Sequence, residues 1–373
     1  MKMVLTTLLL ILAGLPALAT EHGAYVWGGY LNNNHSPTGL NDSVNHLLDH
    51  GGHVARIAIS PQVSQDLGIC QAPGTQTDAC ALGAILSLGA FKDPRLTTLI
   101  ISFHDYLSNN FITTAGWTVA NARAMGAEYA QDFAQVNSLL ASRTTPLRII
   151  LGNWEGDNQI YCGQAYGFFA NYPGVRAACP DWKNRTLGWF QWAQFRSDLV
   201  AGAPSTPQVL WDFMAEFNAY RMALPANAPG CSIGSSTCDT NYTIWNQIRL
   251  GASNVLGRAT TFQHCSFSSY DSVYAKATAV DFPNILAACP SLIIGELGEP
   301  SRVAGWQTFY ASAAATIANY PTAIPYTVIW NYITDSSNGD QGFGLYWGDA
   351  TAPETGAGNP NEVAGITAAG LWP

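Results

Sequence analysis

The stretch Ser291-Leu-Ile-Ile-Gly-Glu-Leu-Gly-Glu-Pro300 has the pattern of a buried strand that ends in a carboxylate. Its first four residues, mostly leucine and isoleucine, are typical of a parallel strand covered on both faces. Gly295 then removes all side-chain bulk, and Glu296 follows at once. Because an unpaired carboxylate is costly to bury there, we expect Glu296 either to pair with an arginine or to serve the function of the protein.

Strand-like and helix-like stretches alternate along the rest of the chain. Eight β-rich stretches, including the one above, are expected to form strands, at residues 23–30, 54–59, 96–103, 147–151, 209–217, 261–267, 291–294 and 326–330. Stretches with helical spacing fall between most of them, at residues 41–48, 81–88, 115–140, 187–200, 244–252 and 303–318. Asn41 or Ser43 is expected to cap the first helix. The alternation predicts an α/β fold with a single parallel (β/α)8 barrel, a TIM barrel, over residues 20–373.

Residues 1–19 have the features of a secretory signal peptide. Lys2 supplies the positive end, residues 4–15 form the apolar core, and Ala17-Leu-Ala19 matches a small-x-small cleavage site. The apolar core is too short to span a membrane, and no later run approaches the ~20 apolar residues that a span requires. The sequence therefore predicts a secreted protein, extracellular or periplasmic, with no membrane anchor.

Composition excludes several classes of partner. Only 11% of residues are charged, the formal net charge is −9, and lysine and arginine form no run. Nucleic acid, anionic membranes and polyanionic glycans are therefore not expected as partners. Twelve tryptophans and 16 tyrosines are many for one domain. Most must lie in the core, but the same residue types would form a stacking surface for sugar rings.

The cysteines indicate disulfides rather than a metal site. Eight cysteines fall in close sequence pairs, namely Cys70/Cys80, Cys162/Cys179, Cys231/Cys238 and Cys265/Cys289. An even count in an exported chain favours disulfides, and no Cys-x-x-Cys motif is present. If neighbours pair, each bridge staples a loop. We expect no metal or other cofactor, and a monomer.

Polar and aromatic groups collect on or just after the expected strands, at Arg56, His104, Glu155, Glu216, Tyr270, Glu296 and Trp330. The carboxyl ends of barrel strands form the face that carries active sites, so these groups are expected at one barrel mouth. Glu155 and Glu296 follow strands four and seven and can face each other across it. Cleavage of a glycosidic bond uses such a pair, one carboxyl protonating the leaving oxygen and the other attacking the anomeric carbon or activating water.

The ordered set resembles the clan A glycoside hydrolases, and most of all the family 5 cellulases and mannanases. Gly295-Glu-Leu-Gly298 resembles the Gly-Glu-Phe-Gly nucleophile motif of that group. The resemblance implies that Glu296 is the nucleophile and Glu155 the acid/base of a retaining mechanism. It also implies that Arg56 on strand two and Tyr270 after strand six hold the nucleophile. His104 after strand three and Trp330 at the end of strand eight would line the −1 sugar subsite.

Two departures from the family pattern stand out. The clan usually places an asparagine directly before the acid/base, where this chain has Trp154, with Asn153 one residue earlier. Either the strand end bulges so that Asn153 holds the sugar 2-hydroxyl, or the sugar is held differently. Both residues are candidates for substrate binding. On strand six, Ser268-Ser-Tyr270 replaces the usual His-x-Tyr, so a divergent relative within the same clan fits better than family 5 itself.

Other readings of these residues stay open. Glu296 could simply be the ion-pair partner of Arg56, and Glu216 is either a rival acid or a satisfied carboxylate of the barrel rim. Glu299 could replace Glu296 if the strand ran three residues longer. Three aspartates could either bind sugar hydroxyls or cap helices, namely Asp105, Asp157 and Asp271. Two tryptophans could be either sugar platforms or core residues, namely Trp306 and Trp347.

The sequence as a whole predicts a secreted, retaining glycoside hydrolase acting on a neutral poly- or oligosaccharide. The alternative is a barrel that binds carbohydrate without catalysis. An esterase or lipase is not expected, because the one Gly-x-Ser-x-Gly match, Gly230-Cys-Ser-Ile-Gly234, falls in the cysteine-bearing loop after the fifth strand and not at a strand-to-helix turn. A lyase of uronate polymers would need more basic residues to hold its substrate.

Overall fold

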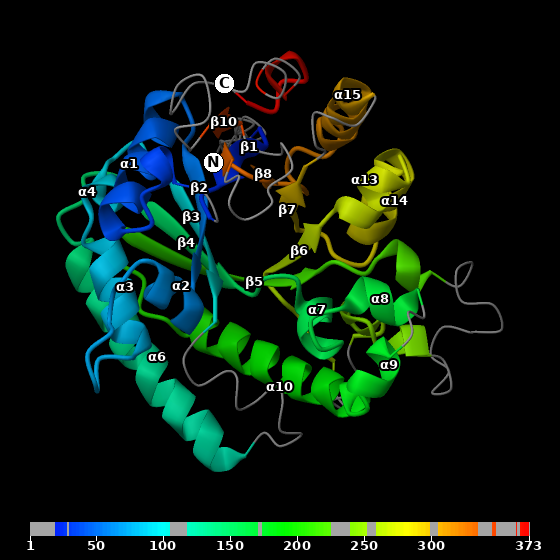
Figure 1. Ribbon diagram of the computed structural model, residues 1–373, viewed down its shortest axis with the longest axis horizontal. Helices are drawn as coiled ribbons and strands as arrows, with labels where there is room; N and C mark the ends of the chain where they lie inside the picture. Colours follow the sequence, from blue (N-terminus) through cyan, green and yellow to red (C-terminus); the bar gives the residue numbers. More distant parts are fainter. Residues whose placement is uncertain are drawn as a thin grey trace, which may run out of the picture.

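The computed structural model describes residues 19–27, 30–104, 118–170, 174–224, 239–251, 259–298, 305–334, 345–347, 363 and 366–372. Eight parallel strands close into a barrel in chain order, with the last paired to the first (Figure 1), which confirms the predicted TIM barrel. The strands are β1 (Glu21–Tyr25), β2 (Val54–Ile59), β3 (Thr98–Phe103), β4 (Leu147–Gly152), β5 (Val209–Phe217), β6 (His264–Ser268), β7 (Leu292–Leu297) and β8 (Tyr326–Ile329).

The strands are apolar on both faces because each face packs against something. One set of side chains fills the barrel interior, namely Tyr25, Val54, Ile100, Ile150, Met214, Ile293, Tyr326 and Val328. The other set packs against the surrounding helices as part of the main core. The strand register with both neighbours shifts near the end of β7, and there Glu296 is opposite Ser268 of β6. Glu296 therefore lies within β7, one residue before its end, and not after it.

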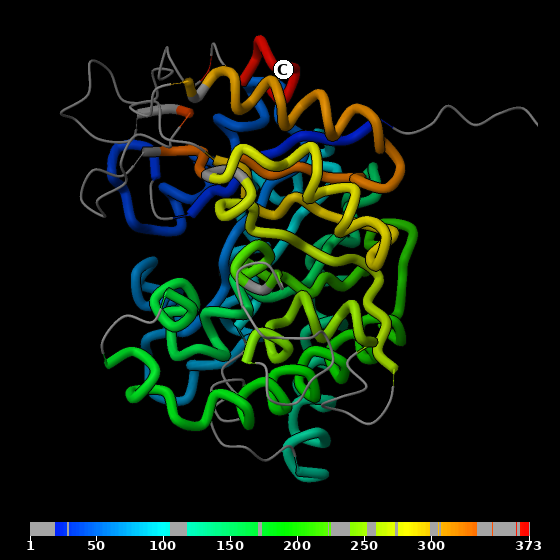
Figure 2. The backbone as a smooth tube through the Cα atoms, turned by 90° about the vertical axis from the view of Figure 1, so that its right-hand side faces the viewer, coloured from blue at the N-terminus to red at the C-terminus, as the bar shows by residue number. Residues whose placement is uncertain are grey.

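Helices surround the barrel, and the two longest lie side by side on one flank (Figure 1). They are α6 (Val119–Leu139) and α10 (Trp182–Ala201). On another flank α14 (Thr278–Leu286) and α15 (Trp306–Ile317) lie side by side (Figure 2). The remaining described α-helices are α1 (Pro37–Asp49), α2 (Pro61–Asp66), α3 (Asp78–Leu86), α4 (Gly89–Lys92), α7 (Gly156–Ile160), α8 (Ala165–Phe169), α9 (Val175–Ala178), α11 (Ile244–Arg249) and α13 (Tyr270–Tyr274).

The first helix begins earlier than its apolar spacing predicted. Ser36 caps α1, its hydroxyl accepting a hydrogen bond from the backbone N–H of Gly39, and Pro37 occupies the first turn. The expectation of Asn41 or Ser43 as the cap is wrong. Ser43 is buried inside the helix and donates to the carbonyl of Gly39 one turn back.

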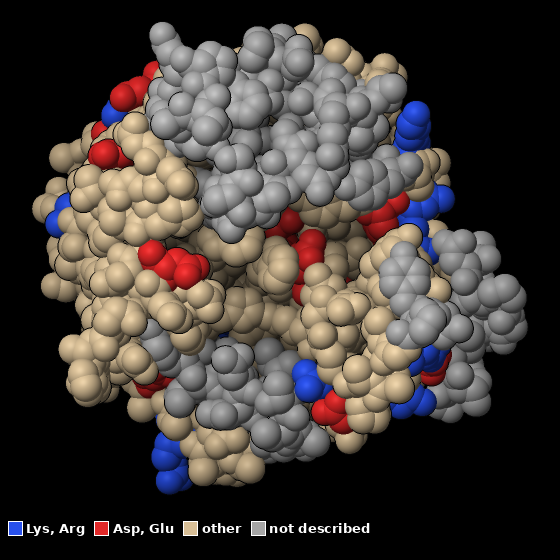
Figure 3. Space-filling view, viewed as in Figure 1, with Lys and Arg blue, Asp and Glu red and all other residues tan. Residues whose placement is uncertain are grey.

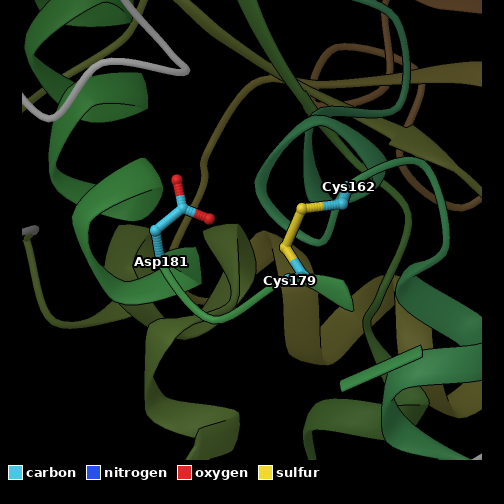
Figure 4. A group of neighbouring side chains, drawn as sticks. All are labelled: Cys162, Cys179 and Asp181. Carbon is cyan, nitrogen blue, oxygen red and sulfur yellow. A yellow bond between two sulfur atoms is a disulfide. The ribbon is translucent and has the colours of Figure 1, made fainter. Parts of the chain in front are cut away.

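Three predicted disulfides are confirmed: Cys70–Cys80, Cys162–Cys179 and Cys265–Cys289. The expected fourth pair, Cys231 and Cys238, lies outside the described residues. Asp181 approaches the Cys162–Cys179 bridge (Figure 4), and the three side chains have the spacing of metal ligands. Both sulfurs are used in the disulfide, however, and Asp181 pairs with Arg185. This cluster is a stapled loop and not a metal site.

Within the described part of the chain, no helix has the length and apolar character needed to cross a membrane. The predicted signal peptide lies outside the described residues, apart from Ala19.

Candidate active site

A cavity of about 980 Å³ opens at the carboxyl ends of the strands. The space-filling view shows a hollow near the centre of this face with acidic side chains inside it (Figure 3). Its polar lining consists of Glu155, Asn158, Asn218, Arg221, Ser268, Asp271 and Glu296, and its aromatic lining of Trp154, Tyr166, Phe169, Tyr270 and Trp330. The predicted carboxylate pair thus lies in one cavity with three of the predicted binding residues.

A single hydroxyl joins the two predicted catalytic carboxylates. Ser268, the last residue of β6, has its Oγ 2.8 Å from Glu155 Oε1 and 3.2 Å from Glu296 Oε2. The two carboxylate oxygens can therefore be no farther apart than the sum of these distances, about 6 Å. Sequence reasoning treated Ser268 only as the loss of a family histidine. Its position at the end of a strand between the two carboxylates was the available signal.

Glu155 is held in an unusual backbone conformation three residues after β4 and directly before α7. Its φ of 36° and ψ of 64° lie in the left-handed region, which residues other than glycine rarely adopt. Its N–H donates to Glu216 Oε1 at 3.0 Å, and Asn158 Nδ2 donates to its Oε2 at 2.5 Å. Burial raises the pKa of Glu155 to about 7, with a smaller contribution from the charge of Glu216.

Glu296 is almost completely buried, with 1% of its surface exposed. Burial raises the pKa of Glu296 well above its ordinary value, and the charge of Glu155 adds to the effect, whereas Arg56 opposes it. Arg56 Nη1 lies 3.7 Å from Glu296 Oε1. This oxygen has no hydrogen-bond partner within the described part of the chain. Both carboxyls therefore have raised pKa values, which favours a proton on the pair.

The strong partner of Arg56 is Glu216 on β5, and not Glu296 as expected. Arg56 Nη1 and Nη2 each donate to one Glu216 oxygen at 2.8 Å, and Nη1 also donates to the carbonyl of Gly295 at 2.7 Å. Both side chains of this ion pair are fully buried. Of its two interpretations, rival acid or satisfied carboxylate, Glu216 fits the second. It is not among the residues that line the cavity.

Asn153 does not meet the expectation that it contacts substrate. It is fully buried, and its amide is occupied with the backbone of Glu216: Nδ2 donates to the carbonyl at 2.8 Å and Oδ1 accepts from the N–H at 2.9 Å. The structure thus directs the Asn153 amide to the Glu216 backbone and not into the cavity. The neighbouring Trp154 faces the cavity instead.

An aromatic wall borders the cavity on the side of β1 and β8. Trp330 directly follows β8, and Trp27 follows β1 and was not singled out by sequence reasoning. The ring of Trp27 is 5.4 Å from that of Trp330 and 6.1 Å from that of Trp154, measured between centroids. Tyr270 lines the cavity from the start of α13.

His104 lies deeper than expected for a residue that touches substrate. Gln159 Nε2 is within 3.1 Å of its ring nitrogens, and the ring stacks on Trp192 of α10. Burial and the charge of Arg196 lower the pKa of His104 to about 4, so the ring is neutral at neutral pH. It is not among the described cavity-lining residues.

The structure places the three aspartates that could bind sugar hydroxyls or cap helices in different surroundings. Asp157 is buried and accepts backbone N–H bonds from Asn218, Ala219 and Ile244, which is a structural role. Asp271 lines the cavity and also accepts the N–H of Arg221. Asp105 and the rival nucleophile Glu299 lie outside the described residues, as do the side chains of Trp306 and Trp347.

No protein-family model matches the chain, and no curated protein matches it. Solved structures do match in fold. They include a family 1 β-glucosidase from Thermotoga maritima (TM-score 0.55, 8% identity, 96% of each chain covered) and a GH5-4 broad-specificity endoglucanase from Bacteroides salanitronis (0.50, 14%, 94% of this chain and 93% of that one). A third is a GH5_18 protein from Streptomyces cattleya, solved with Manβ1-4GlcNAc (0.50, 11%, 92% and 80%). The structural neighbours of this barrel thus include clan A glycoside hydrolases of families 1 and 5, and the similarity is one of fold.

Proposed function

We propose that this protein is a retaining glycoside hydrolase with Glu296 as nucleophile and Glu155 as acid/base. The observation that carries the proposal is the pair of buried carboxylates bridged by Ser268 at the barrel mouth. Retaining enzymes hold their two carboxyls about 5–5.5 Å apart, and inverting enzymes about 6.5–9.5 Å apart to admit a water. An oxygen separation of at most about 6 Å favours retention.

The reaction begins and ends with one proton on the pair. Glu155 gives its proton to the leaving oxygen while Glu296 attacks the anomeric carbon, so the glycosidic bond breaks and a glycosyl ester forms. Glu155 then takes a proton from water, and the water oxygen displaces Glu296 from the anomeric carbon. The pKa of Glu155, raised to about 7, suits a group that acts first as acid and then as base.

The cavity lining favours a neutral poly- or oligosaccharide. Trp154, Tyr270 and Trp330 offer ring faces and edges for stacking on sugars. Glu155, Glu296 and Asp271 would repel a polyanionic chain, and Arg221 in the same cavity already pairs with Asp281. We assign supporting positions beneath the substrate to Arg56, His104 and Asn153.

The disulfides suit an oxidising compartment, so we infer that the protein is secreted. We further infer that residues 20–373 form one domain that acts as a monomer, without a metal or other cofactor.

Mass spectrometry of the intact protein after exposure to a panel of 2-deoxy-2-fluoro glycosides with activated leaving groups tests the proposal. We expect a covalent adduct that maps to Glu296 by peptide analysis. Glu296→Gln should abolish the adduct, while Glu21→Gln, an exposed glutamate at the other end of the barrel, should keep it. An adduct on Glu216 would overturn the site. Unchanged hydrolysis by both Glu296→Gln and Glu155→Gln, or glycan binding without adduct or hydrolysis, would overturn the proposed reaction.

A further inference from the structure

Arg56, Glu155, Glu216 and Glu296 form a buried ionic cluster at the barrel mouth. Glu216 is the carboxylate of this cluster with the most hydrogen bonds. Its Oε1 accepts from Arg56 Nη2 at 2.8 Å and from the backbone N–H of Glu155 at 3.0 Å. Its Oε2 accepts from Arg56 Nη1 at 2.8 Å and from Ser266 Oγ at 2.7 Å. Guanidinium and backbone N–H groups can only donate, so both oxygens of Glu216 serve as acceptors, as in an ionised carboxylate.

In this arrangement Glu216 compensates the charge of Arg56, so Arg56 stabilises an ionised Glu296 only weakly. Arg56 meets Glu216 through two parallel 2.8 Å bonds, the strong fork geometry, but approaches Glu296 no closer than 3.7 Å. The buried cluster holds one cation and three carboxyls, so it would carry a net charge of −2 if all three ionised. Two uncompensated negative charges in a buried site are costly, and the cheapest relief is one proton on the pair that lacks the fork.

Glu216 also fixes the position of Glu155. The left-handed backbone of Glu155 points its N–H at Glu216 Oε1, and Asn153 ties the backbone of Glu216 to the segment just before Glu155. The β5 carboxylate thus contacts the backbone of one member of the pair and the cation that faces the other.

We propose that Glu216 is a positioning residue for the Glu155–Glu296 pair: its carboxylate takes up Arg56 and so obliges the pair to keep one proton between them. The roles of acid and nucleophile in this statement rest on the proposed function, whereas the proton count does not. The proton of the pair is the one that the first chemical step consumes and the second restores.

Several other groups face this cluster. Tyr25 of β1 lies with its ring 4.5 Å from the Arg56 guanidinium carbon, and Asp157 of α7 lies near Glu155. Ser102 of β3 is uncharged, and its hydroxyl oxygen accepts a hydrogen bond from Arg56 Nε at 3.0 Å. Burial raises the pKa of Tyr25 far above its ordinary value, so Tyr25 stays neutral, whereas burial raises the pKa of Asp157 to about 6.

The proposal is tested by carboxyl ¹³C NMR of protein labelled at the side-chain carboxyl carbon of glutamate. The chain has only eight glutamates, and single Glu→Gln variants assign the resonances. The Glu155 and Glu296 resonances should together report one proton that is lost near neutral pH. A pair that is fully ionised above about pH 5 would overturn the proposal.

Glu216→Gln provides the second arm. Removal of the charge frees Arg56 for Glu296, so the titration midpoints of Glu155 and Glu296 should fall by about one pH unit or more. Ser266→Ala is the matched control, since it removes one hydrogen bond to Glu216 but leaves its charge, and it should leave both midpoints within about half a unit. Midpoints that respond equally in the two variants would indicate a merely structural role.

The NMR readout needs no substrate, which separates the two proposals. The expected titration in a protein that traps no fluoro glycoside would leave the role of Glu216 intact and contradict the hydrolase. Should Glu216→Gln fail to fold, the wild-type titration still decides.

Discussion

Gly295 leaves open the space that the carboxylate of Glu216 occupies. A Cβ built on residue 295 would overlap Glu216 Oε2 and Ser266 Oγ, and it would lie 2.9 Å from Arg56 Nη1. The glycine before Glu296 is therefore required by the buried ionic cluster, because the three nearest atoms that a side chain would meet belong to Arg56, Glu216 and the serine bonded to Glu216. The nucleophile candidate and its buried support are packed against each other through a residue without a side chain.

Gly295→Ala should destabilise the protein by about 1–3 kcal/mol, the usual cost of overpacking a filled interior. The methyl group must displace either the Arg56–Glu216 fork or β7 itself, and neither can move without loss of buried hydrogen bonds. The free energy of unfolding in urea measures the effect, and catalytic activity should fall with it.

The matched control is Gly126→Ala in α6. A Cβ there meets only Phe195 and Leu199 at ordinary contact distances, 3.8 Å and 4.0 Å. Because alanine is the better helix former, this variant should be unchanged or more stable by up to about 1 kcal/mol. A Gly295→Ala protein as stable as Gly126→Ala would contradict the packing of the cluster.

Ser268→Ala should alter the pH dependence of the proposed reaction. The Ser268 hydroxyl lies within hydrogen-bond distance of both carboxylates and lowers the pKa of each, so its loss should raise the pKa of Glu155 and of Glu296 further. We expect the acidic limb of the kcat/KM profile to move to higher pH. The rate at the optimum should fall by about tenfold or more, as for the loss of a hydrogen bond to a charged group.

Ser269→Ala is the control for that substitution. The neighbouring Ser269 is equally buried, but its hydroxyl donates to the backbone carbonyl of Glu296 and touches neither carboxylate. It should lower stability without moving the pH profile. Identical profiles for the two variants would show that the shared hydroxyl does not tune the pair.

The eight strands and the positions of Glu155 and Glu296 at one barrel mouth were predictable from the sequence. β2 and β5 have the predicted bounds, because buried parallel strands form continuous apolar runs between clear breaks. Glu296 was recognised because a carboxylate is conspicuous at the end of such a run.

The partners within the site were not predictable in the same way. Arg56, Glu216 and Glu296 all point into one buried space, and sequence gives no distances to decide which carboxylate forms the fork with Arg56. Asn153 faced the same limit: its neighbour Trp154 enters the cavity while its own amide turns to the Glu216 backbone. The left-handed backbone at Glu155 sets the directions of these side chains, and a glutamate at that position does not predict such a conformation.

Arg196→Lys should destabilise the protein by about 2 kcal/mol or more. From α10, Arg196 Nη2 donates to the carbonyls of Phe103 and Gly152, at the ends of β3 and β4, and its Nε donates to the hydroxyl of Tyr129. A lysine cannot reproduce this fork, and its buried charge would keep fewer partners. Thermal unfolding measures the loss. The exposed Arg123→Lys should stay within about 0.5 kcal/mol of wild type, and equal stability of the two variants would contradict the assigned role of Arg196.

Glu155→Gln should make the protein more stable at alkaline pH. The pKa of Glu155 rises from 4.5 to about 7 on folding, so the folded state binds this proton more tightly than the unfolded state. The stabilisation is fully present below about pH 4.5 and is lost as the pH rises through about 7. Glutamine carries no charge to bury, so the variant should equal wild type near pH 4 and exceed it by about 3 kcal/mol at pH 8. Urea unfolding at both pH values measures this difference. Glu21→Gln should show no such change, and a Glu155→Gln protein that gains nothing at pH 8 would mean that Glu155 is already ionised at little cost in the folded protein.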